Sequence, residues 1–150
     1  MRCWIFQFNP DRFNALPSFY GKDEHHWTIK QYAGQIRKGD ICLIWQSGKS
    51  DIRGIYAIGE IVTDPAYILD PAEESKNWKK EKDRNKKEIR VKFVFTHKLL
   101  DDPILLSEIR SYQELQGLAI IRQPQCSNSP VVASEWSVIE KLIENRGKIA

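Results

Sequence analysis

The segment from Asp40 to Ile61, DICLIWQSGKSDIRGIYAIGEI, constrains the fold of this chain more than any other. Its first half contains ICLIW, in which all residues are apolar, so a strand here would be apolar on both faces. This pattern is typical of a central strand that is covered on both sides. GIYAIGEIV follows after a short polar turn and is expected to be its partner strand. The sequence therefore predicts a layered fold around a sheet with two buried faces.

Other segments add strands to this pair. Residues 3–8, CWIFQF, alternate aromatic and β-branched side chains and are bounded by an Asn-Pro pair. Residues 88–96 alternate a core face with an outer face that carries Arg90 and Lys92. LAII, at 118–121, is a further expected strand. About five or six strands are therefore predicted in all.

Helix signals occur early in the chain and near its end. Thr28 and Gln31 form a capping box, and apolar residues at helical spacing follow up to Ile36, which predicts a helix there. Two more helices are expected, one from Pro103 to Ile109 and one from Ser134 to Gly147. The combination implies an α+β domain with a curved or barrel-like sheet.

The composition bounds the class of protein. At 150 residues the chain has the size of one domain, and no repeat or linker divides residues 1–150, which are also compatible with a module of a longer protein. Three cysteines, an odd number set far apart, argue against a disulfide framework and favour a reducing, cytoplasmic location. The sequence contains no signal-peptide core and no apolar run long enough to span a bilayer, so no membrane partner is expected.

Positive charge is concentrated in one stretch. The net charge is only +3, but residues 76–92 hold nine Lys or Arg against three acids. Such a cluster suits a nucleic-acid backbone, because neutralised phosphates release counterions. A solvated, mobile charged loop is the alternative, and the sequence alone favours neither.

Sequence signals for catalysis and metal binding are weak. His25 and His26 are adjacent and point in different directions on most backbones, while His97 has no Cys or acid at ligand spacing. The sequence contains no nucleophile elbow, phosphate-binding glycine loop or dinucleotide fingerprint. We therefore expect no metal site, no cofactor and no enzymatic activity in this chain.

Two tryptophans are the most informative binding residues. Trp45 is the last apolar residue of its strand, and Gln46, Ser47 and Gly48 place an amide, a hydroxyl and accessible backbone beside its ring, where a flat ligand could stack. Trp27 lies off the apolar stripe of its predicted helix. The structural alternatives are a core position for Trp45 and a hydrophobic staple for Trp27.

Two further features point to a recess. Gly59 interrupts a strand, where glycine often marks a bulge or a close approach by a ligand or another backbone. The segment 122–129 holds Arg, Gln, Asn and Ser side chains, which offer donors and acceptors to a base edge or a phosphate. An ordinary polar loop explains this second feature equally well.

Several segments, taken in order, resemble a known family. They are WIFQFNP, HHWTIKQYAGQIRKGDICLIWQSG, GIYAIGEIVTDP, IRVKFVF and PQCSNSPVVASEWSVIEKLI, and they extend over nearly the whole chain. The most specific part is the tryptophan before Gly39-Asp40, the strand ending in IWQSG and the glycine-containing strand that ends at Asp64-Pro65. This series resembles the EVE domain, a member of the PUA-like superfamily that is related to YTH domains.

The resemblance implies a fold and a type of ligand. The fold is a strongly bent, PUA-like β-barrel flanked by helices, with a pocket that holds a nucleobase. YTH relatives hold methylated adenine of RNA in an aromatic cage, and EVE-like modules of bacteria and archaea are linked to modified bases in DNA, often fused to restriction nuclease or NTPase domains. We therefore expect nucleic acid as the partner, with DNA favoured over RNA and any cleavage in a fused or associated domain.

The resemblance also implies site residues. Trp27 and Trp45 correspond to cage walls, with Trp78 as a third wall and Tyr67 as its rival. The other expected pocket residues are Asn9, Gln46, Ser47, Gly48, Gln125, Ser127 and Asn128. Contacts to phosphates are expected from Lys79, Lys80, Lys82, Arg84, Lys86, Lys87 and Arg122.

The leading hypothesis is a reader that takes a modified, flipped base between Trp27 and Trp45. Unstacking costs a few kcal/mol and stacking on an aromatic ring contributes about 1–3 kcal/mol, so the two terms nearly cancel. Edge hydrogen bonds and the fit of a methyl or hydroxymethyl group would then supply selectivity. The alternatives are an RNA-binding module of the PUA or YTH type and a domain that binds a free nucleotide or metabolite.

Overall fold

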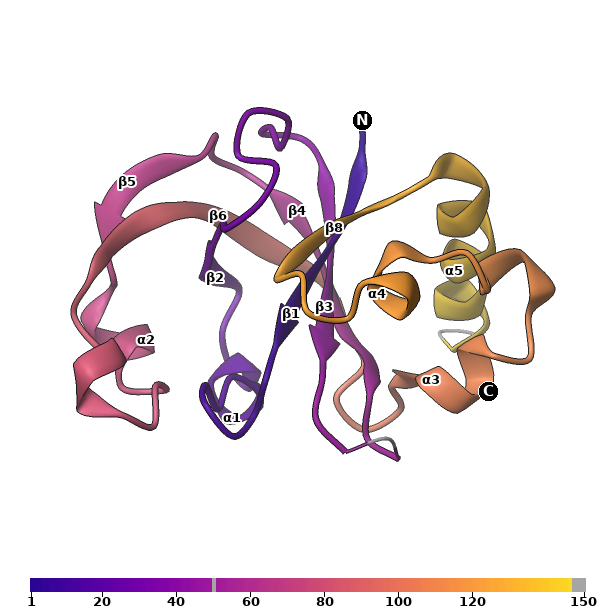
Figure 1. The fold of residues 1–150 in the computed structure, drawn as a ribbon, viewed down its shortest axis with the longest axis horizontal. Coiled ribbons are helices and arrows are strands. Elements are labelled where there is room, and N and C mark those ends of the chain that lie inside the picture. The colour runs from indigo at the N-terminus through magenta and orange to yellow at the C-terminus, as the bar shows by residue number, and fades with distance from the viewer. Residues whose placement is uncertain (50, 147–150) are drawn as a thin grey trace.

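The computed structural model describes residues 1–49 and 51–146, and its strands belong to one mixed sheet. The strands are β1 (Cys3–Phe8), β2 (Glu24–Thr28), β3 (Ile41–Gln46), β4 (Gly54–Ile61), β5 (Ala66–Leu69), β6 (Lys87–Lys98), β7 (Ile104–Leu105) and β8 (Asn128–Val131). Their order is β2-β6-β4-β3-β1-β8, with β5 beside β6 and β7 beside β4 (Figure 1). β1 and β3 run parallel, and the other pairs are antiparallel.

Short helices fill the connections, and one longer helix follows the last strand. They are α1 (Leu16–Phe19), α2 (Ala72–Ser75), α3 (Leu106–Ile109), α4 (Ala119–Arg122) and α5 (Ala133–Arg146), with 3-10 turns η1 (Glu81–Asp83) and η2 (Gln113–Leu115). Glu135 caps the start of α5, because its Oε1 accepts a hydrogen bond from Val132 N (3.0 Å). The predicted end of this helix at Gly147 lies outside the described residues.

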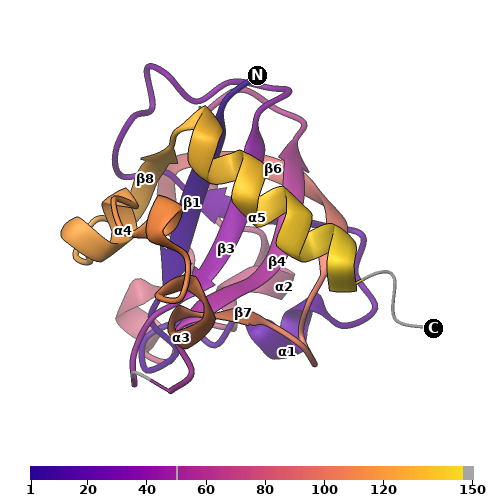
Figure 2. The same ribbon diagram turned by 90° about the vertical axis from the view of Figure 1, so that its right-hand side faces the viewer.

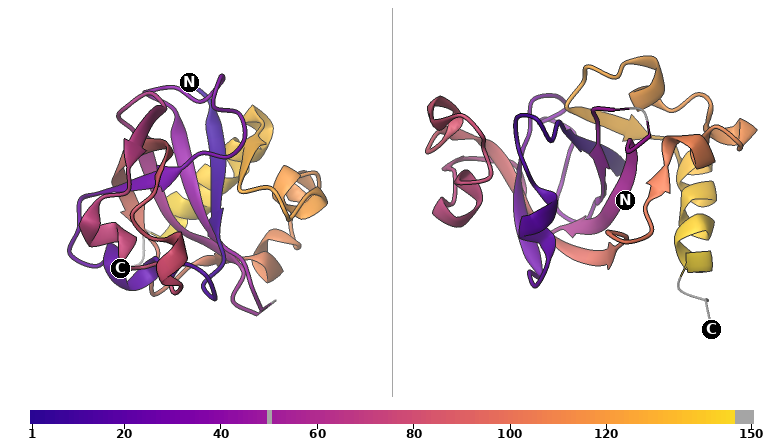
Figure 3. Two further views of the ribbon diagram at one scale, coloured as in Figure 1. Left: turned by 60° about the vertical axis from the view of Figure 1, so that its left-hand side comes forward. Right: turned by 90° about the horizontal axis from the view of Figure 1, so that it is seen from below.

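The sheet bends so strongly that its two ends meet (Figure 3). Three strands separate β2 from β1 in the sheet order, yet the rings of Trp27 and Phe6 stack with centroids 6.4 Å apart. The backbone ladder does not close between the edge strands β2 and β8. Asn128 Oδ1 instead accepts hydrogen bonds from the backbone N of Lys30 (2.7 Å) and Gln31 (3.1 Å), and Asn128 N donates to Gln31 Oε1 (3.0 Å). This "Asn128 clasp" joins the edges of a strongly bent sheet whose backbone ladder stays open. The predicted α+β fold with a strongly bent, barrel-like sheet is therefore confirmed.

The concave side of the sheet encloses an aromatic inner core. Along β1, alternation turns Trp4, Phe6 and Phe8 into this core and Cys3 and Ile5 to the opposite side. Further members come from β2, β3, β4, β6 and α1, and they include Phe19, Trp27, Cys42, Ile44, Ala57, Ile61, Val91 and Phe93. Side chains distant in sequence thus fill one interior.

Helix α5 covers the convex side, where it lies across β1, β3 and β4 (Figure 2). The outer core beneath it includes Ile5, Leu43, Trp45, Ile55, Ile58, Ile139, Leu142 and Ile143. Within β3, Leu43 and Trp45 belong to the outer core, and Cys42 and Ile44 belong to the inner core. The predicted central strand with two buried faces is therefore confirmed.

The helix predicted after Thr28 is wrong, since a strand and an irregular segment occupy its place. β2 includes Thr28, and Ile29 N extends the pairing by donating to Ile89 O (2.8 Å). Tyr32 has a φ of 63°, a left-handed conformation incompatible with a right-handed helix. Gln31 uses its side chain in the Asn128 clasp. Tertiary hydrogen bonds therefore override the local capping signal.

Three further expectations need correction. LAII does not form a strand: Leu118 precedes helix α4, and the other three residues belong to that helix. Its apolar character reflects the burial of Leu118 and Ile120 in the outer core. The expected polar loop at 122–129 contains the start of β8, which pairs with β1. Arg90 does not face outward: it is buried, and an ion pair described below explains why.

Gly59 marks a bulge in the pairing of β4 with β6, as the sequence predicts. A Cβ atom at this position would lie 2.5 Å from the Phe93 ring and 2.9 Å from Val94 O. The close approach is therefore made by strand β6 and not by a ligand.

The three cysteines are unpaired, with Cys3 and Cys42 buried in different cores. Among residues 1–49 and 51–146, no helix has the length and apolar character that crossing a bilayer requires. The cytoplasmic location and the extent of the domain stay predictions.

Candidate functional site

A pocket of about 420 Å³ opens where the inner core meets the end of β1. Its volume lies in the range of roughly 300–1,000 Å³ that is typical of small-molecule sites. We call it the main pocket, and its lining residues are Gln7, Phe8, Asn9, Arg12, Phe13, His26, Trp27, Thr28, Lys30, Ser47, Asp70, Glu74, Trp78, Asp83, Lys86, Glu88, Arg90, Pro124, Gln125 and Ser127.

Two tryptophans connected by a phenylalanine form the aromatic part of this lining. Trp27, on β2, is 6% exposed and meets Phe13 edge-on with ring centroids 5.9 Å apart. Phe13 also contacts Trp78, at a centroid distance of 4.6 Å. The structure therefore places Trp27 and Trp78 in one pocket, as predicted.

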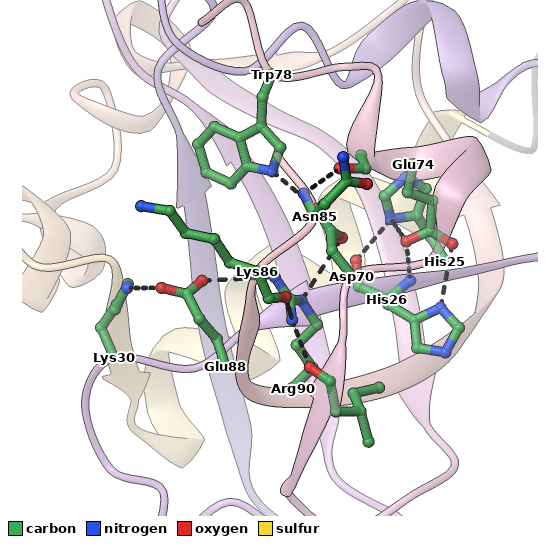
Figure 4. A network of polar contacts seen from close by, with 12 residues as sticks. His25, His26, Lys30, Asp70, Glu74, Trp78, Asn85, Lys86, Glu88 and Arg90 are labelled. Carbon is green, nitrogen blue, oxygen red and sulfur yellow. Dashed lines mark hydrogen bonds and ion pairs between the residues drawn. The ribbon is translucent and has the colours of Figure 1, made fainter. Parts of the chain in front are cut away.

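Trp78 belongs to the segment 70–86 between β5 and β6, and this segment is tied down at several points. Trp78 and Phe13 form a β-bridge, and Trp78 Nε1 donates to Asp70 Oδ2 (3.1 Å; Figure 4). Asp70 N donates to Lys86 O (2.9 Å), which closes the base of the segment. The basic stretch is therefore part of the pocket wall and is not a free charged loop.

Arg90 anchors the same segment from below (Figure 4). Its Nη1 donates to Ile68 O (2.7 Å) and Lys86 O (3.0 Å), and its Nε lies 3.6 Å from Asp70 Oδ1. Burial raises the pKa of Asp70, although the charge of Arg90 and the hydrogen bond from Trp78 oppose this rise. Because both charges are buried and hydrogen-bonded, the pair fixes the position of the Trp78 wall.

Glu74, on α2, forms a second polar contact of the pocket wall (Figure 4). Its Oε1 accepts a hydrogen bond from His26 N (3.0 Å), and its Oε2 lies 3.1 Å from His26 Nδ1. Burial acts to raise the pKa of Glu74, but the hydrogen bonds from His26 and the proximity of His25 outweigh it, so this pKa is lowered. An ionised carboxylate is therefore held at the pocket.

His25, which precedes His26 in the sequence, is fully buried. Its Nδ1 lies 2.6 Å from the carbonyl oxygen of His26, which only accepts, so Nδ1 carries the proton. Burial lowers the pKa of His25, against the opposing charge of Glu74. The imidazole is therefore held neutral among the aromatic rings.

The charges of the main pocket are balanced. Lys30 Nζ lies 2.7 Å from Glu88 Oε1, and Arg90 Nη2 lies 3.5 Å from Glu88 Oε2. The lining contains four carboxylates, Asp70, Glu74, Asp83 and Glu88, and four basic side chains, Arg12, Lys30, Lys86 and Arg90. Such a lining complements a neutral ring with polar edges better than an anion.

Four predicted polar residues lie in the lining, namely Asn9, Ser47, Gln125 and Ser127. Ser47 Oγ donates to Phe8 O (3.0 Å), so its hydrogen is already used. Gln7, which was not predicted, donates from Nε2 to Pro124 O (2.6 Å) and thereby holds the loop at 124–127 against β1. Gln125 is exposed on this loop at the edge of the pocket.

The prediction that Trp45 faces Trp27 across the pocket is wrong. Trp45 is 3% exposed, belongs to the outer core and does not line the main pocket. The reason is strand alternation, which places Trp45 on the same face of β3 as Leu43. Trp45 and Gly48 instead border a smaller hollow of about 120 Å³ on that side.

Three other residues also lie outside the main pocket. Gln46 is buried and its Nε2 contacts Ile52 O at 3.4 Å. Asn128 is buried in the clasp between β2 and β8. Tyr67, the rival of Trp78, is 69% exposed on β5 and is absent from the described lining.

The predicted phosphate-binding residues have different surroundings. Lys86 lines the main pocket, and Lys79, Lys80, Lys82 and Lys87 are exposed in the same segment or beside it. Arg84 Nε donates to Trp78 O (2.9 Å), and Arg122 Nε donates to Gly117 O (2.9 Å), so both guanidinium groups also hold local backbone. Their roles toward phosphate stay predictions.

Sequence reasoning missed Phe13, Asp70, Glu74 and the buried role of Arg90. One usable signal was the arginine inside an apolar strand pattern, because a buried arginine requires a carboxylate partner. The sequence did not identify Asp70 as that partner. Among the described residues, no group of three His, Cys, Asp or Glu side chains has the geometry of a metal site.

Solved structures share this fold at low sequence identity. The human THYN1 protein in complex with DNA that contains 5-methylcytosine has a TM-score of 0.68 and 16% identity, with 96% of this chain and 98% of that chain aligned. A hypothetical protein from Leishmania major has a TM-score of 0.63 and 22% identity, with 99% and 98% aligned. The DUF55 domain of human thymocyte nuclear protein 1 has a TM-score of 0.65 and 18% identity, with 95% and 98% aligned.

Sequence comparison gives the family directly. No curated protein sequence matches the chain significantly. The model of the EVE domain matches residues 2–142, which confirms the resemblance found in the sequence. The chain belongs to the EVE domain family.

Proposed function

We propose that this EVE domain binds nucleic acid and takes one flipped, modified base into the main pocket, with DNA as the favoured polymer. The observation that carries the proposal is the pocket itself: Trp27 and Trp78 line a space of about 420 Å³ whose polar lining has balanced charge. A base is a flat, neutral ring with donors and acceptors on its edges, and this lining complements such a ligand.

The aromatic residues would supply stacking energy. Base stacking on an aromatic side chain contributes about 1–3 kcal/mol, which nearly offsets the few kcal/mol that unstacking costs. Trp78 is the partly exposed ring of the pair, and its Nε1–H is already bonded to Asp70. Its indole is therefore held in position before a base enters.

Hydrogen bonds at the base edge would supply selectivity. Glu74 offers carboxylate oxygens, and Gln125 and Ser127 offer donors and acceptors from the opposite loop. A methyl group that fills an apolar part of the lining, such as the space beside Phe8 or Phe13, would add about 1–3 kcal/mol. This contribution is what a preference for a modified base requires.

The basic segment would hold the flanking backbone. Lys86 is at the pocket itself, and Lys79, Lys80, Lys82 and Lys87 are exposed nearby in the sequence. Neutralising each phosphate releases counterions and makes binding depend on salt. These contacts would provide affinity, while the pocket would provide discrimination.

A structural relative supports the choice of ligand by analogy. The human THYN1 protein was crystallised with DNA containing 5-methylcytosine, and it shares the fold of this chain at 16% identity. Fold alone does not carry function, so the residues of the main pocket are what support this ligand. We assign binding to this domain and any cleavage to a fused or associated nuclease or NTPase.

The test is an affinity panel at one salt concentration. Labelled duplexes and single strands, of DNA and of RNA, would carry a plain, methylated or hydroxymethylated base at one position. We expect tighter binding of one modified DNA duplex, and Trp78→Ala should weaken that binding by roughly 1–3 kcal/mol. Tyr67→Ala is the matched control, because this aromatic lies on the neighbouring strand outside the pocket.

Three outcomes would contradict the proposal. Equal loss in Trp78→Ala and Tyr67→Ala would mean that the main pocket does not hold the base. Preferential binding of RNA would identify the RNA-binding alternative. Saturable, salt-independent binding of a free nucleoside without duplex binding would identify a small-molecule domain.

A further inference from the structure

A second hollow of about 120 Å³ adjoins the main pocket on the outer side of β3. The two share Gln7, Ser47 and Pro124 in their linings, so they are neighbours separated by these side chains. Trp45 and Gly48 form another part of its wall, which brings together residues that the sequence singled out. We call it the small hollow.

The small hollow has a different charge from the main pocket. Arg53 and Arg110 line it, and no Asp or Glu occurs in its lining. Neither arginine takes part in an ion pair within the described part of the chain. The hollow is therefore cationic, whereas the main pocket is balanced.

Arg53 provides a second observation. Its Nε atom is buried, and the described residues provide no hydrogen-bond partner for it. A buried donor without an acceptor is costly, and a ligand with oxygen acceptors would relieve this cost. Leu106, Ile120 and Ile121 form apolar walls, and apolar surroundings strengthen the attraction between a guanidinium and an anion.

We propose that the small hollow binds one phosphate group through Arg53 and Arg110. A guanidinium presents planar pairs of N–H donors that match phosphate oxygens, and a hollow of about 120 Å³ has room for one such anion. This inference rests on the proposed function in one respect. It assigns the phosphate to the backbone beside the flipped nucleotide, whose base occupies the adjoining main pocket.

The arrangement assigns separate tasks to two neighbouring sites. The main pocket discriminates between bases, and the small hollow fixes the register of the backbone without reading sequence. Trp45 then acts as one wall of the small hollow, and not as a stacking surface.

The first experiment uses inorganic phosphate as the probe and needs no nucleic acid. We expect phosphate to shift the Nε–H resonance of Arg53 and the indole resonance of Trp45 saturably in NMR spectra. Arg110→Gln removes an exposed side chain, should fold normally and should weaken this response at least threefold. Arg53→Lys keeps the charge but loses the planar donors and should weaken it as well. Lys141→Gln, an exposed position on α5, changes the net charge equally and should have no effect.

The second experiment measures duplex affinity between 50 and 200 mM salt. Loss of one phosphate contact lowers the salt slope by about 0.9. Between 50 and 200 mM salt, the factor by which affinity falls should therefore be about 3.5 times smaller for Arg110→Gln than for the wild type. The ratio of affinities for modified and plain duplexes should stay unchanged.

The outcomes separate the two proposals. If phosphate shifts only exposed lysines, or shifts Arg53 equally in Arg110→Gln and in the wild type, the phosphate site is wrong. If the duplex binds but the salt slope of Arg110→Gln equals that of the wild type, the backbone assignment is wrong while the base pocket stands. If inorganic phosphate binds as expected but no nucleic acid binds, the hollow is a site for free phosphate and the proposed function fails.

Discussion

Trp27 on the inner side of the sheet and Trp45 on its outer side have different surroundings. Trp27 and Trp45 are almost equally buried, at 6% and 3% exposure, so burial does not distinguish them. Trp27 lies on the edge strand β2, where the segment 70–86 extends the inner core into a pocket. Trp45 lies on the central strand β3, under the layer that α5 completes. The position of a strand in the sheet therefore decides which aromatic ring borders the main pocket.

The largest expected effect comes from Trp45→Ala, which tests the outer side of this comparison. Removing a buried tryptophan from a packed core costs about 3–5 kcal/mol, because contacts are lost and a cavity remains. We expect the free energy of unfolding, measured with urea, to fall by this amount. Folded Trp45→Ala protein should keep the wild-type ratio of affinities for modified and plain duplexes.

Trp78→Ala is the matched change on the inner side. Trp78 is only partly buried, so its removal should reduce stability less than that of Trp45. Loss of base preference in Trp45→Ala without loss of stability would contradict this comparison. That result would mean that Trp45, and not Trp78, contacts the bound base.

The second effect concerns the Asn128 clasp, which is part of the inner side alone. Asn128→Ala leaves the backbone N–H groups of Lys30 and Gln31 without their acceptor, at a cost of about 1–3 kcal/mol. We expect faster hydrogen exchange in β2 and weaker binding of the modified duplex. Exchange in β3, under α5, should change only as far as global stability falls. Uniform acceleration across both sides would contradict a local role for the clasp.

The third effect is a pH dependence that the inner side should confer. Burial lowers the pKa of His25 from its ordinary 6.5, so its stabilising contribution is complete above pH 6.5 and is lost as the pH falls below that value. Glu74, with a lowered pKa, loses its contribution only as the pH falls below its ordinary 4.5. Asp70 acts in the opposite direction, because its raised pKa favours protonation in the folded state.

His25→Asn measures this dependence. Between pH 7 and 5 the stability of the wild type should fall, by at most about 1.4 kcal/mol per pH unit for one proton, and the variant should show a flatter profile. His97→Asn, which removes an exposed histidine of β6, is the matched control. Equal slopes in all three proteins would show that His25 does not control the acid sensitivity.

The outer side could be predicted from the sequence more fully than the inner side. The continuous apolar run ICLIW predicts that both faces of β3 are buried, and the period of two in a strand places Trp45 on one face with Ile41 and Leu43. The amide and hydroxyl after Trp45 suggested a ligand, but strand alternation places its ring with Leu43 in the outer core. The family resemblance placed Trp27 and Trp78 correctly at a pocket, which periodicity alone did not.

Long-range hydrogen bonds account for most of what the sequence did not reveal. Gln31 is 97 positions from Asn128, and the same glutamine completes an apparent capping box with Thr28. Arg90 is buried only because Asp70 and backbone carbonyls satisfy it. The contact of Gln31 with Asn128 depends on the bend of the whole sheet, and the burial of Arg90 depends on how the segment 70–86 folds against β6. A local sequence pattern contains neither.

The smallest expected effect tests whether a surface lysine contributes more to duplex binding on the inner side than on the outer side. Lys80 is exposed in the segment that forms the wall of the main pocket, and Lys141 is exposed on α5. If a duplex lies over the main pocket, Lys80→Gln should reduce the salt slope of binding by about 0.9, the contribution of one phosphate. Lys141→Gln removes the same charge from the outer side and should leave the slope unchanged. Equal slopes for the two variants would mean that net charge, and not a backbone path beside Trp78, attracts the duplex.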